Sequence, residues 1–245
     1  MQIFLKNGDE LSLEDGARCS DAAKAVSESL ARNAVAAKIN GKLTDLSAPL
    51  SQGDKVEFVT LKDKEGLEVY RHTCAHVLAQ AVKTIFPTCN LAIGPVVDNG
   101  FYYDVELDHR ISTEDFERIE EEMKKVVKEN QVFQKEVISR ADAMKMAESG
   151  ELGALGPRSE PSRFKIDLLN DIPEDEEISL YRNGDFTDLC AGPHVGRTGN
   201  CKAFKIMSVA SAFYKGDKNR PMLQRIYGTC FPNRTLLDEH LERLE

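Results

Sequence analysis

The 245-residue sequence contains no tryptophan, and its six cysteines form no Cys-x-x-Cys pair. Scattered cysteines in a chain of this size favour reduced thiols over a disulfide framework. No apolar run approaches the ~18 residues that a membrane-spanning helix requires. Charged residues interrupt the first segment, MQIFLKNGDE, where a signal peptide would carry an apolar core. These absences argue against a membrane protein and a secreted disulfide-rich domain, and they predict a cytoplasmic chain.

The residues that are present suit a globular protein. Hydrophobic residues make up 41% of the sequence and charged residues 30%, which is enough apolar material for a core. At roughly 150 residues per domain, the length predicts one or two domains. The sequence contains no internal repeat and no low-complexity tract.

Positive charge is concentrated in one part of a chain whose net charge is −9. Between Gly196 and Thr235 there are eight basic residues and one acidic residue, Asp217, so this stretch carries a local charge of +7. Aromatic residues lie among these charges, and such a mixture suits stacking on unpaired RNA bases. They are Phe204, Phe213, Tyr214, Tyr227 and Phe231. The alternative is a solvated basic face on strands whose aromatic side chains point into the core.

Residues 1–61 form a self-contained pattern. Short alternating strands flank Asn7-Gly8 and Asn40-Gly41, which are strong hairpin signals. A helix whose N-cap we expect at Ser20 follows the first hairpin, and a further strand, DKVEFVTL, closes the region. This order predicts a β-grasp domain. Ubiquitin-like adaptors share the order, so it does not identify a function.

The charged segment 62–66 is a predicted linker, and a helix is expected from Glu68 to Phe86. Two β segments around residues 98–100 follow, and then a long helix capped by Ser112 and Asp115. The glutamates of this helix, Glu117, Glu120, Glu121 and Glu122, are expected on a solvated face.

A surface loop is expected over 148–162 and an acidic loop over 171–177. Five segments are predicted strands of a mostly antiparallel sheet: FKIDLL, ISLYRNG, FTDLC, CKAFKIMSV and MLQRIYGTCF. A last helix begins near Asn233 and is expected to continue to residue 245, which suggests a piece of a longer protein. The fold class expected for the whole chain is α+β.

Two motifs hold three of the five histidines. His72 and His76 are four residues apart on a predicted helix, so their imidazoles share one face. Cys190 and His194 follow a predicted strand, and Asp188 lies two residues before Cys190, on the same side of that strand. Three interpretations remain open: a zinc site, metal-free hydrolysis by imidazoles and a carboxylate, and histidines that satisfy core hydrogen bonds.

Five segments occur in one order: HTCAHVLAQAV, AIGPVVDNGFYYDVEL, TDLCAGPHV, FKIMSVASAFYKGD and MLQRIYGTCF. Together they resemble the N-terminal half of bacterial threonyl-tRNA synthetases, over nearly the whole chain. The resemblance implies a TGS domain of β-grasp fold at 1–61 and a tRNA-editing, or second additional, domain at 67–232. It implies that 233–245 begin a linker helix toward a class II catalytic core that is absent here.

The implied activity is hydrolysis of serine wrongly attached to tRNA(Thr), within a threonine--tRNA ligase. A binding pocket gains only ~1–3 kcal/mol of discrimination from one methyl group, so a second, hydrolytic site is needed. The implied catalytic set is His72, His76, Lys165, Asp188, Cys190 and His194. Substrate contacts are expected at Gly94, Tyr103, Lys215 and Arg220.

Roles follow from the same resemblance. Lys165 and His72 are the candidates for positioning or activating water. Asp188 would hold the ammonium or hydroxyl of serine, while Cys190 and His194 would shape the pocket. Judged by pattern alone, Lys165 would be a solvated strand lysine and Tyr103 a core or rim residue.

No cofactor is expected for editing. In the alanyl relatives the positions of His72, His76, Cys190 and His194 hold zinc, so zinc here is the alternative. ATP and a further zinc are expected only in the missing core. The expected partner is the acceptor end of tRNA(Thr) carrying serine, with no membrane. The fragment is expected to be monomeric, and the full-length enzyme a homodimer through its core. A tRNA-binding module without activity and a free-standing editing factor are the other candidates.

Overall fold

The structure, a computed structural model, describes residues 1–244. Its chain divides into two compact units. The first comprises Met1–Tyr70 and the short segment Gly192–Gly196, and the second comprises the rest of the described chain. No helix within residues 1–244 is long and apolar enough to cross a membrane.

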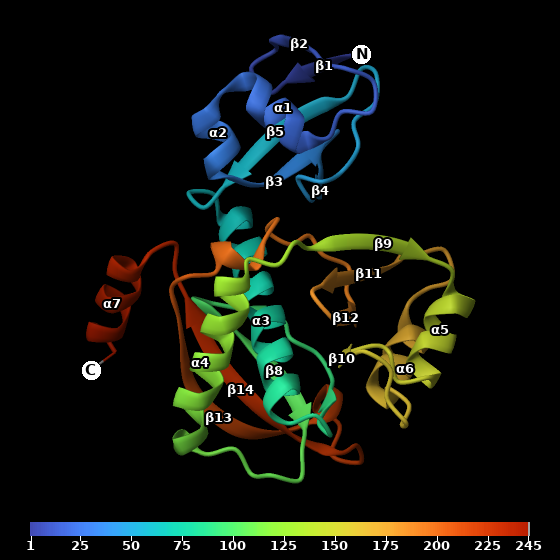
Figure 1. Cartoon of the computed structure of the whole chain (residues 1–245), viewed down its shortest axis with the longest axis vertical. Helices are drawn as coiled ribbons and strands as arrows, with labels where there is room; N and C mark the ends of the chain where they lie inside the picture. Colours follow the sequence, from blue (N-terminus) through green and yellow to red (C-terminus); the bar gives the residue numbers. More distant parts are fainter. Residues whose placement is uncertain (245) are drawn as a thin grey trace. The chain divides into compact units, whose positions relative to one another are not determined.

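The first unit contains one mixed sheet, drawn in blue and cyan in Figure 1. Its strands are β1 (Gln2–Leu5), β2 (Glu10–Ser12), β3 (Ala34–Ile39), β4 (Lys42–Thr44) and β5 (Lys55–Thr60). They lie in the order β2-β1-β5-β3-β4, and only the β1–β5 pair is parallel. Asn40 and Gly41 have φ of 52° and 85°, the left-handed conformation that a tight hairpin turn requires. The predicted β-grasp order is confirmed.

Two short helices, α1 (Cys19–Val26) and α2 (Glu28–Asn33), follow the first hairpin. The N-cap of α1 is Arg18 rather than the predicted Ser20, because the Asp21 carboxylate accepts the Arg18 backbone N–H at 2.9 Å. Cys19 and Ala22 of α1 pack with Ile3 and Val56 of the sheet in a common core. One face of the sheet therefore builds the core of this unit.

The second unit is arranged around helix α3 (Lys64–Ile85), whose first residues belong to the first unit. The helix begins four residues before the predicted start at Glu68, so the expected linker 62–66 is already partly helical. Val77, Leu78 and Val82 are fully buried, which gives α3 a wide apolar surface.

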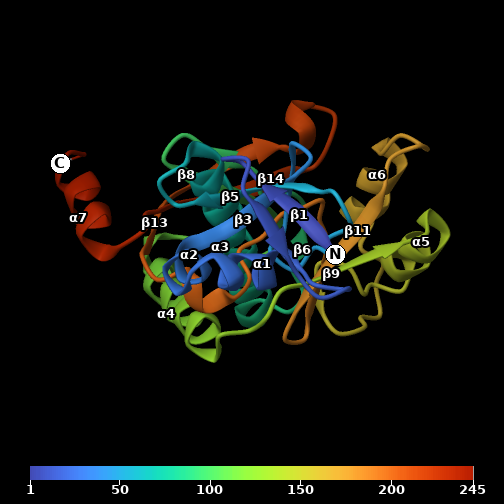
Figure 2. The ribbon, with the colours of Figure 1, turned by 90° about the horizontal axis from the view of Figure 1, so that it is seen from above.

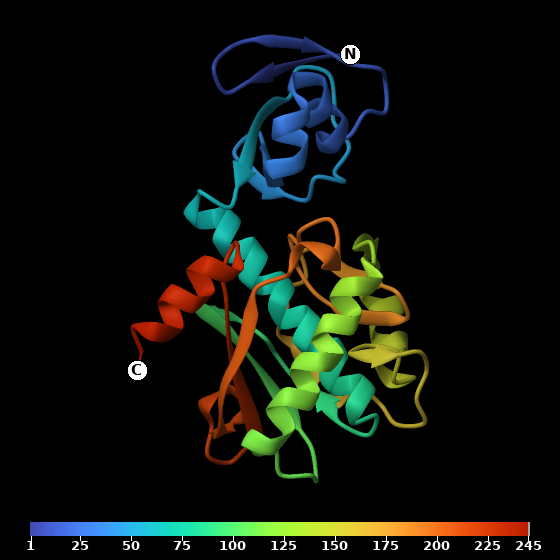
Figure 3. The same cartoon turned by 60° about the vertical axis from the view of Figure 1, so that its left-hand side comes forward.

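An antiparallel sheet lies against α3 and α4 (Thr113–Glu129), as Figures 1 and 3 show. Its strands are β6 (Asn90–Leu91), β7 (Val96–Val97), β8 (Gly100–Glu106), β13 (Phe204–Phe213) and β14 (Met222–Cys230). Their order is β13-β14-β8-β6, with β7 also paired to β8. The predicted Ser112–Asp115 capping box is present on α4. Glu120 of α4 does not belong to the solvated face, because it is buried and accepts the backbone N–H of Ile206 at 2.9 Å.

A second antiparallel sheet has the order β10-β12-β11-β9. Its strands are β9 (Gln134–Ile138), β10 (Ala154–Leu155), β11 (Ile178–Asn183) and β12 (Phe186–Leu189). Helices α5 (Arg140–Glu148) and α6 (Arg163–Asp171) lie side by side near it (Figure 2). The predicted surface loop 148–162 contains β10, and Leu152 and Ala154 in it are buried.

The segment FKIDLL, predicted as a strand, is instead part of α6. Phe164 and Leu169 are buried, while Arg140 donates to the carbonyl oxygens of Leu169 and Ile172 at the end of the helix. These tertiary contacts decide the conformation of a segment whose alternating pattern suggested a strand. The predicted α+β fold class holds, with two antiparallel sheets in the second unit rather than one.

Three short elements complete the described chain. These are the single-turn helices η1 (Thr198–Asn200) and η2 (Tyr214–Gly216) and the last helix, α7 (Arg234–Glu242). Asn233 caps α7 by accepting the Leu236 backbone N–H at 3.0 Å. The helix ends at Glu242, so the expectation that it continues to residue 245 is wrong.

Candidate active site

A pocket of about 370 Å³ in the second unit collects most of the residues that the two motifs single out. Its wall is formed by helices α3 and α6, by strands β8 and β12, and by the segments that follow β6 and β12. The lining residues are His72, His76, Ala92, Ile93, Gly94, Pro95, Tyr103, Lys165, Leu168, Asp188, Leu189, Cys190 and Ala191. The structure thus brings candidate residues from distant parts of the sequence around one cavity.

The centre of the pocket wall is a buried ion pair between Lys165 and Asp188. The Lys165 Nζ lies 2.9 Å from Asp188 Oδ1 and 3.1 Å from Oδ2, and the two side chains are 3% and 4% exposed. The same ammonium donates to the Ala92 carbonyl oxygen at 2.8 Å and lies 3.3 Å from the Tyr103 hydroxyl. These partners occupy all three N–H groups of the ammonium, which burial of a lysine requires.

Tyr103 completes this network from strand β8. Its hydroxyl donates to Asp188 Oδ2 at 3.0 Å. Burial and the neighbouring Asp188 carboxylate raise the pKa of Tyr103 well above its ordinary value, so the phenol stays neutral and acts as a donor. Asp188 also accepts the Leu189 backbone N–H at 2.8 Å. The carboxylate is therefore fixed on three sides.

Two glycines make room for this network. A side chain at Gly94 would overlap the ring of Tyr103, so only glycine lets the ring lie against the 92–95 segment. Gly153 has φ of +61°, and a Cβ there would lie 3.1 Å from Cε of Lys165. Gly94 was singled out from the sequence, whereas Gly153 was missed because the nearest motif is far from it in the chain. Its position in a glycine-rich loop was the only available signal.

His72, His76 and Cys190 form a second part of the wall. His72 Nε2 lies 3.4 Å from Cys190 Sγ, which brings the helix motif and the strand motif together. The His76 ring is buried and meets the rings of Phe186 and Phe133 edge-on, at 4.9 and 5.4 Å between centroids. His72 is therefore the half-buried imidazole of the pair, and His76 is the one packed among aromatic rings.

His194 is described with the first unit, because its segment Gly192–Gly196 groups there. It is 1% exposed, and its backbone N–H donates to Asp45 Oδ1 at 2.9 Å. Asp45 was not predicted from the sequence, since it lies in a loop without a recognisable motif.

Much of the positive charge of 196–235 is paired with carboxylates. Lys215 and Arg220 both bind Asp167, at 2.5 and 2.9 Å. Three more cations are paired in the same way: Lys205 with Glu120, Arg225 with Asp104 and Arg234 with Asp238. The local charge counted along the sequence therefore overstates the positive charge presented in space.

The aromatic residues of this stretch differ in accessibility. Phe204 and Tyr214 are buried, so they belong to the core, as the alternative interpretation expected. Tyr227 is half-buried and lies 5.6 Å, between ring centroids, from Tyr102 on the neighbouring strand. Arg225 stacks over the Tyr102 ring at 4.0 Å and pairs with Asp104.

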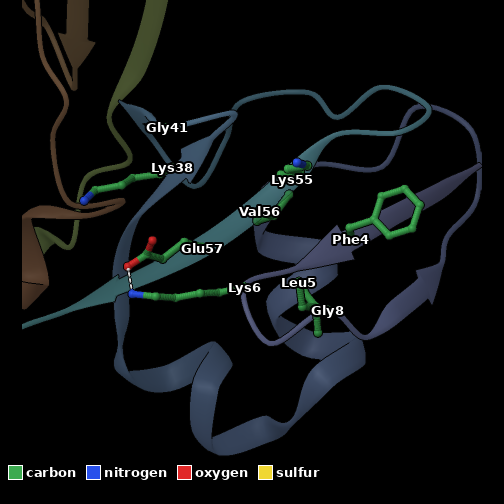
Figure 4. A pocket seen from close by; sticks show the side chains of 9 residues that line it. All are labelled: Phe4, Leu5, Lys6, Gly8, Lys38, Gly41, Lys55, Val56 and Glu57. Carbon is green, nitrogen blue, oxygen red and sulfur yellow. Dashed lines mark hydrogen bonds and ion pairs between the residues drawn. The ribbon is translucent and has the colours of Figure 1, made fainter.

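A second pocket, of about 420 Å³, lies in the first unit (Figure 4). It is larger than the first, yet it contains neither imidazole nor thiol. Three lysines, Lys6, Lys38 and Lys55, line it, and Lys6 pairs with Glu57 at 2.5 Å. Imidazole is the side chain that most often transfers protons at neutral pH, so the smaller pocket, which His72 and His76 line, is the better candidate for chemistry.

Comparison with known proteins identifies the class of each part. Residues 1–60 match the TGS domain family, and residues 178–227 match the threonyl and alanyl tRNA synthetase second additional domain. The chain therefore contains a TGS domain at 1–60 and, at 178–227, a segment that matches the second additional domain of these two synthetases.

The most similar relatives include three threonine--tRNA ligases. The chain is 45% identical over 245 residues to that of Caldanaerobacter subterraneus subsp. tengcongensis, and 45% identical to that of Desulforamulus reducens. It is 46% identical over 246 residues to that of Clostridioides difficile. Each match covers 100% of this chain but only 36% or 37% of the relative. The chain thus spans little more than a third of the length of these ligases and is similar to their N-terminal region.

Proposed function

We propose that this chain is an aminoacyl-tRNA deacylase that removes serine from mischarged tRNA(Thr). The observation that carries the proposal is one pocket lined both by the fixed polar network of Lys165, Asp188 and Tyr103 and by His72 and Cys190. Its volume of about 370 Å³ suits a small aminoacyl group. The proposed setting is a cytoplasmic threonine--tRNA ligase whose remaining length would carry aminoacylation.

Ester hydrolysis requires water to attack the carbonyl carbon and the ribose oxygen to leave with a proton. Of the two candidates for activating water, the contacts favour His72. The Lys165 ammonium donates all three of its N–H groups to protein oxygen atoms and has no lone pair with which to accept a proton. The imidazole of His72, half-buried at the pocket wall beside Cys190 Sγ, is a group of the kind that can accept one at neutral pH. We therefore propose that His72 accepts the proton of water, and that Lys165 holds the Asp188 carboxylate in a fixed orientation.

Asp188 and Tyr103 would then recognise the amino acid. Among residues 1–244, Asp188 carries the only carboxylate that lines this pocket, so it would bind the ammonium or hydroxyl of serine. The Tyr103 ring, held against Gly94, is a rigid wall that the extra methyl group of threonine would meet. A collision with rigid, close-packed atoms is costly, so a wall of this kind can discriminate where an open binding pocket cannot.

The polar network supports a mechanism without metal. His76, one of the four possible zinc ligands, is packed edge-on against Phe133 and Phe186, and Lys165 already supplies a positive charge at the pocket. We propose that chelation leaves hydrolysis unchanged and that no stoichiometric metal co-purifies. Loss of activity on chelation, restored by zinc, would show that the ligand set His72, His76, Cys190 and His194 holds a metal.

Contact with tRNA phosphates is proposed for Lys215 and Arg220, whose side chains are 26% and 39% exposed despite their pairing with Asp167.

The test of the function combines two measurements, the rate of seryl-tRNA hydrolysis and the affinity for tRNA. His72→Ala should lower hydrolysis of seryl-tRNA by about 10²–10⁴-fold, the usual contribution of general base catalysis, while tRNA affinity stays within twofold. Full activity of this variant would remove His72 from the mechanism. Tight tRNA binding without any wild-type hydrolysis would support the binding-module alternative.

A further inference from the structure

Helix α6 carries Lys165 on its buried side and two carboxylates on its exposed side. Asp167 and Asp171 are four residues apart, so they project from neighbouring turns of the helix. Lys215 binds both of them, at 2.5 Å to Asp167, and Arg220 binds Asp167 at 2.9 Å. The segment 214–220 between β13 and β14 is thereby tied to the helix that supplies the pocket ammonium.

The same segment is fixed by its own conformation and packing. Lys215 adopts φ of 54° and ψ of 22°, a left-handed conformation that is unfavourable for a residue with a side chain. The buried Tyr214 ring lies 4.8 Å from that of Phe164, the neighbour of Lys165. Both cations lie over Tyr214, at 5.2 and 5.5 Å from the ring centre. The unfavourable conformation is thus maintained by contacts to α6.

Asp167 is the shared partner in this arrangement. Hydrogen bonding to Lys215, and to a smaller extent to Arg220, lowers the pKa of Asp167 despite the opposing effect of partial burial. A single exposed ion pair contributes little, but several charges converging on one carboxylate act as a network. Loss of Asp167 would release Arg220 and leave Lys215 with Asp171 alone.

We propose that Asp167 is a positioning residue for the deacylase, and that its network with Lys215 and Arg220 fixes where α6 places the Lys165 ammonium. The inference rests on the proposed function. Asp167 itself does not line the pocket. Asp167 acts through the helix, because Lys165 lies two residues before it on α6. The Lys165 ammonium has three partners at fixed distances, so a shift of the helix would disturb these contacts.

Positioning of α6 by Asp167 and contact of Lys215 and Arg220 with tRNA predict different effects of removing the Asp167 carboxylate. If Lys215 and Arg220 serve only as tRNA contacts, removing the competing Asp167 carboxylate frees them and strengthens tRNA binding. If the network positions α6, removing Asp167 lowers turnover. Lys165 orients the Asp188 carboxylate that would hold the amino acid, and a small misplacement of a group that positions substrate is costly. We therefore expect Asp167→Asn to lower kcat about tenfold or more, with KM within twofold.

The experiment compares Asp167→Asn, Asp167→Glu and the charge-matched control Asp175→Asn, which changes an exposed carboxylate in the loop after α6. Steady-state hydrolysis of seryl-tRNA gives kcat and KM, and hydrogen exchange measured by mass spectrometry gives the protection of α6 amides. We expect Asp167→Asn to lower both kcat and the protection of α6, Asp167→Glu to restore part of each, and the control to change neither.

An unchanged kcat in Asp167→Asn, or a change confined to KM and tRNA affinity, overturns the proposal. Hydrogen exchange separates this failure from that of the proposed function. If the wild-type protein does not hydrolyse seryl-tRNA, the deacylase assignment fails, and unchanged protection of α6 in Asp167→Asn still refutes the network by itself.

Discussion

Removing the Asp188 carboxylate should destabilise the second unit strongly. In Asp188→Ala, the Lys165 ammonium, 3% exposed, would keep only the Ala92 carbonyl and the Tyr103 hydroxyl as partners. Removing one partner of a buried ion pair typically lowers the free energy of unfolding by about 3–5 kcal/mol, because the other charge remains desolvated and unpaired. We expect a loss in this range, whereas the exposed control Asp175→Asn should stay within about 0.5 kcal/mol of wild type.

Denaturant unfolding, followed by far-ultraviolet circular dichroism, measures the effect. The double variant Lys165→Met, Asp188→Leu removes both charges and should recover much of the lost stability, since apolar side chains replace buried pairs well. It should remain inactive on seryl-tRNA. A loss below about 1 kcal/mol in Asp188→Ala, the value for an exposed pair, would refute the description of Lys165–Asp188 as a desolvated pair.

Three further outcomes follow from the same structure. Gly94→Ala should displace the Tyr103 ring, lowering seryl-tRNA hydrolysis about tenfold or more while circular dichroism stays unchanged; equal activity would show that the ring position is immaterial. Burial lowers the pKa of Lys83 from 10.5 to about 8, so above pH 8 the folded state releases a proton that the unfolded state keeps. The stability of wild type relative to Lys83→Met should therefore rise between about pH 8 and 10.5, by roughly 3 kcal/mol at most, and a flat difference in urea titrations would contradict this burial effect. The chain should show no ATP-dependent threonine activation, and threonine-dependent pyrophosphate exchange above background would contradict that.

Local sequence signals predicted the elements that depend on local chemistry. The hairpins at Asn7-Gly8 and Asn40-Gly41 form because Gly8, Asn40 and Gly41 adopt the positive φ that their turns require, and the Ser112–Asp115 cap forms because its partners are three residues apart. The α3 motif could likewise be placed, since helical periodicity puts His72 and His76 on one face.

Features that depend on distant partners could not be predicted in this way. The stretch FKIDLL alternates like a strand, yet Arg140 and buried neighbours make it a helix and turn Lys165 inward. The charge of 196–235 was counted along the sequence, whereas Asp104 and Asp167 lie 121 and 48 residues from their partners Arg225 and Lys215. Ion pairs between residues so far apart in the chain cannot be predicted from the local sequence around either partner.

The measurement that tests the account most directly is deacylation of serylated and threonylated tRNA(Thr) by the same wild-type protein. The pocket wall formed by Tyr103 and Gly94 predicts that seryl-tRNA is hydrolysed rapidly and that threonyl-tRNA survives far longer, with or without a chelator. Equal hydrolysis of the two esters, or hydrolysis of neither, would contradict the assignment of this pocket as a serine-selective deacylase site.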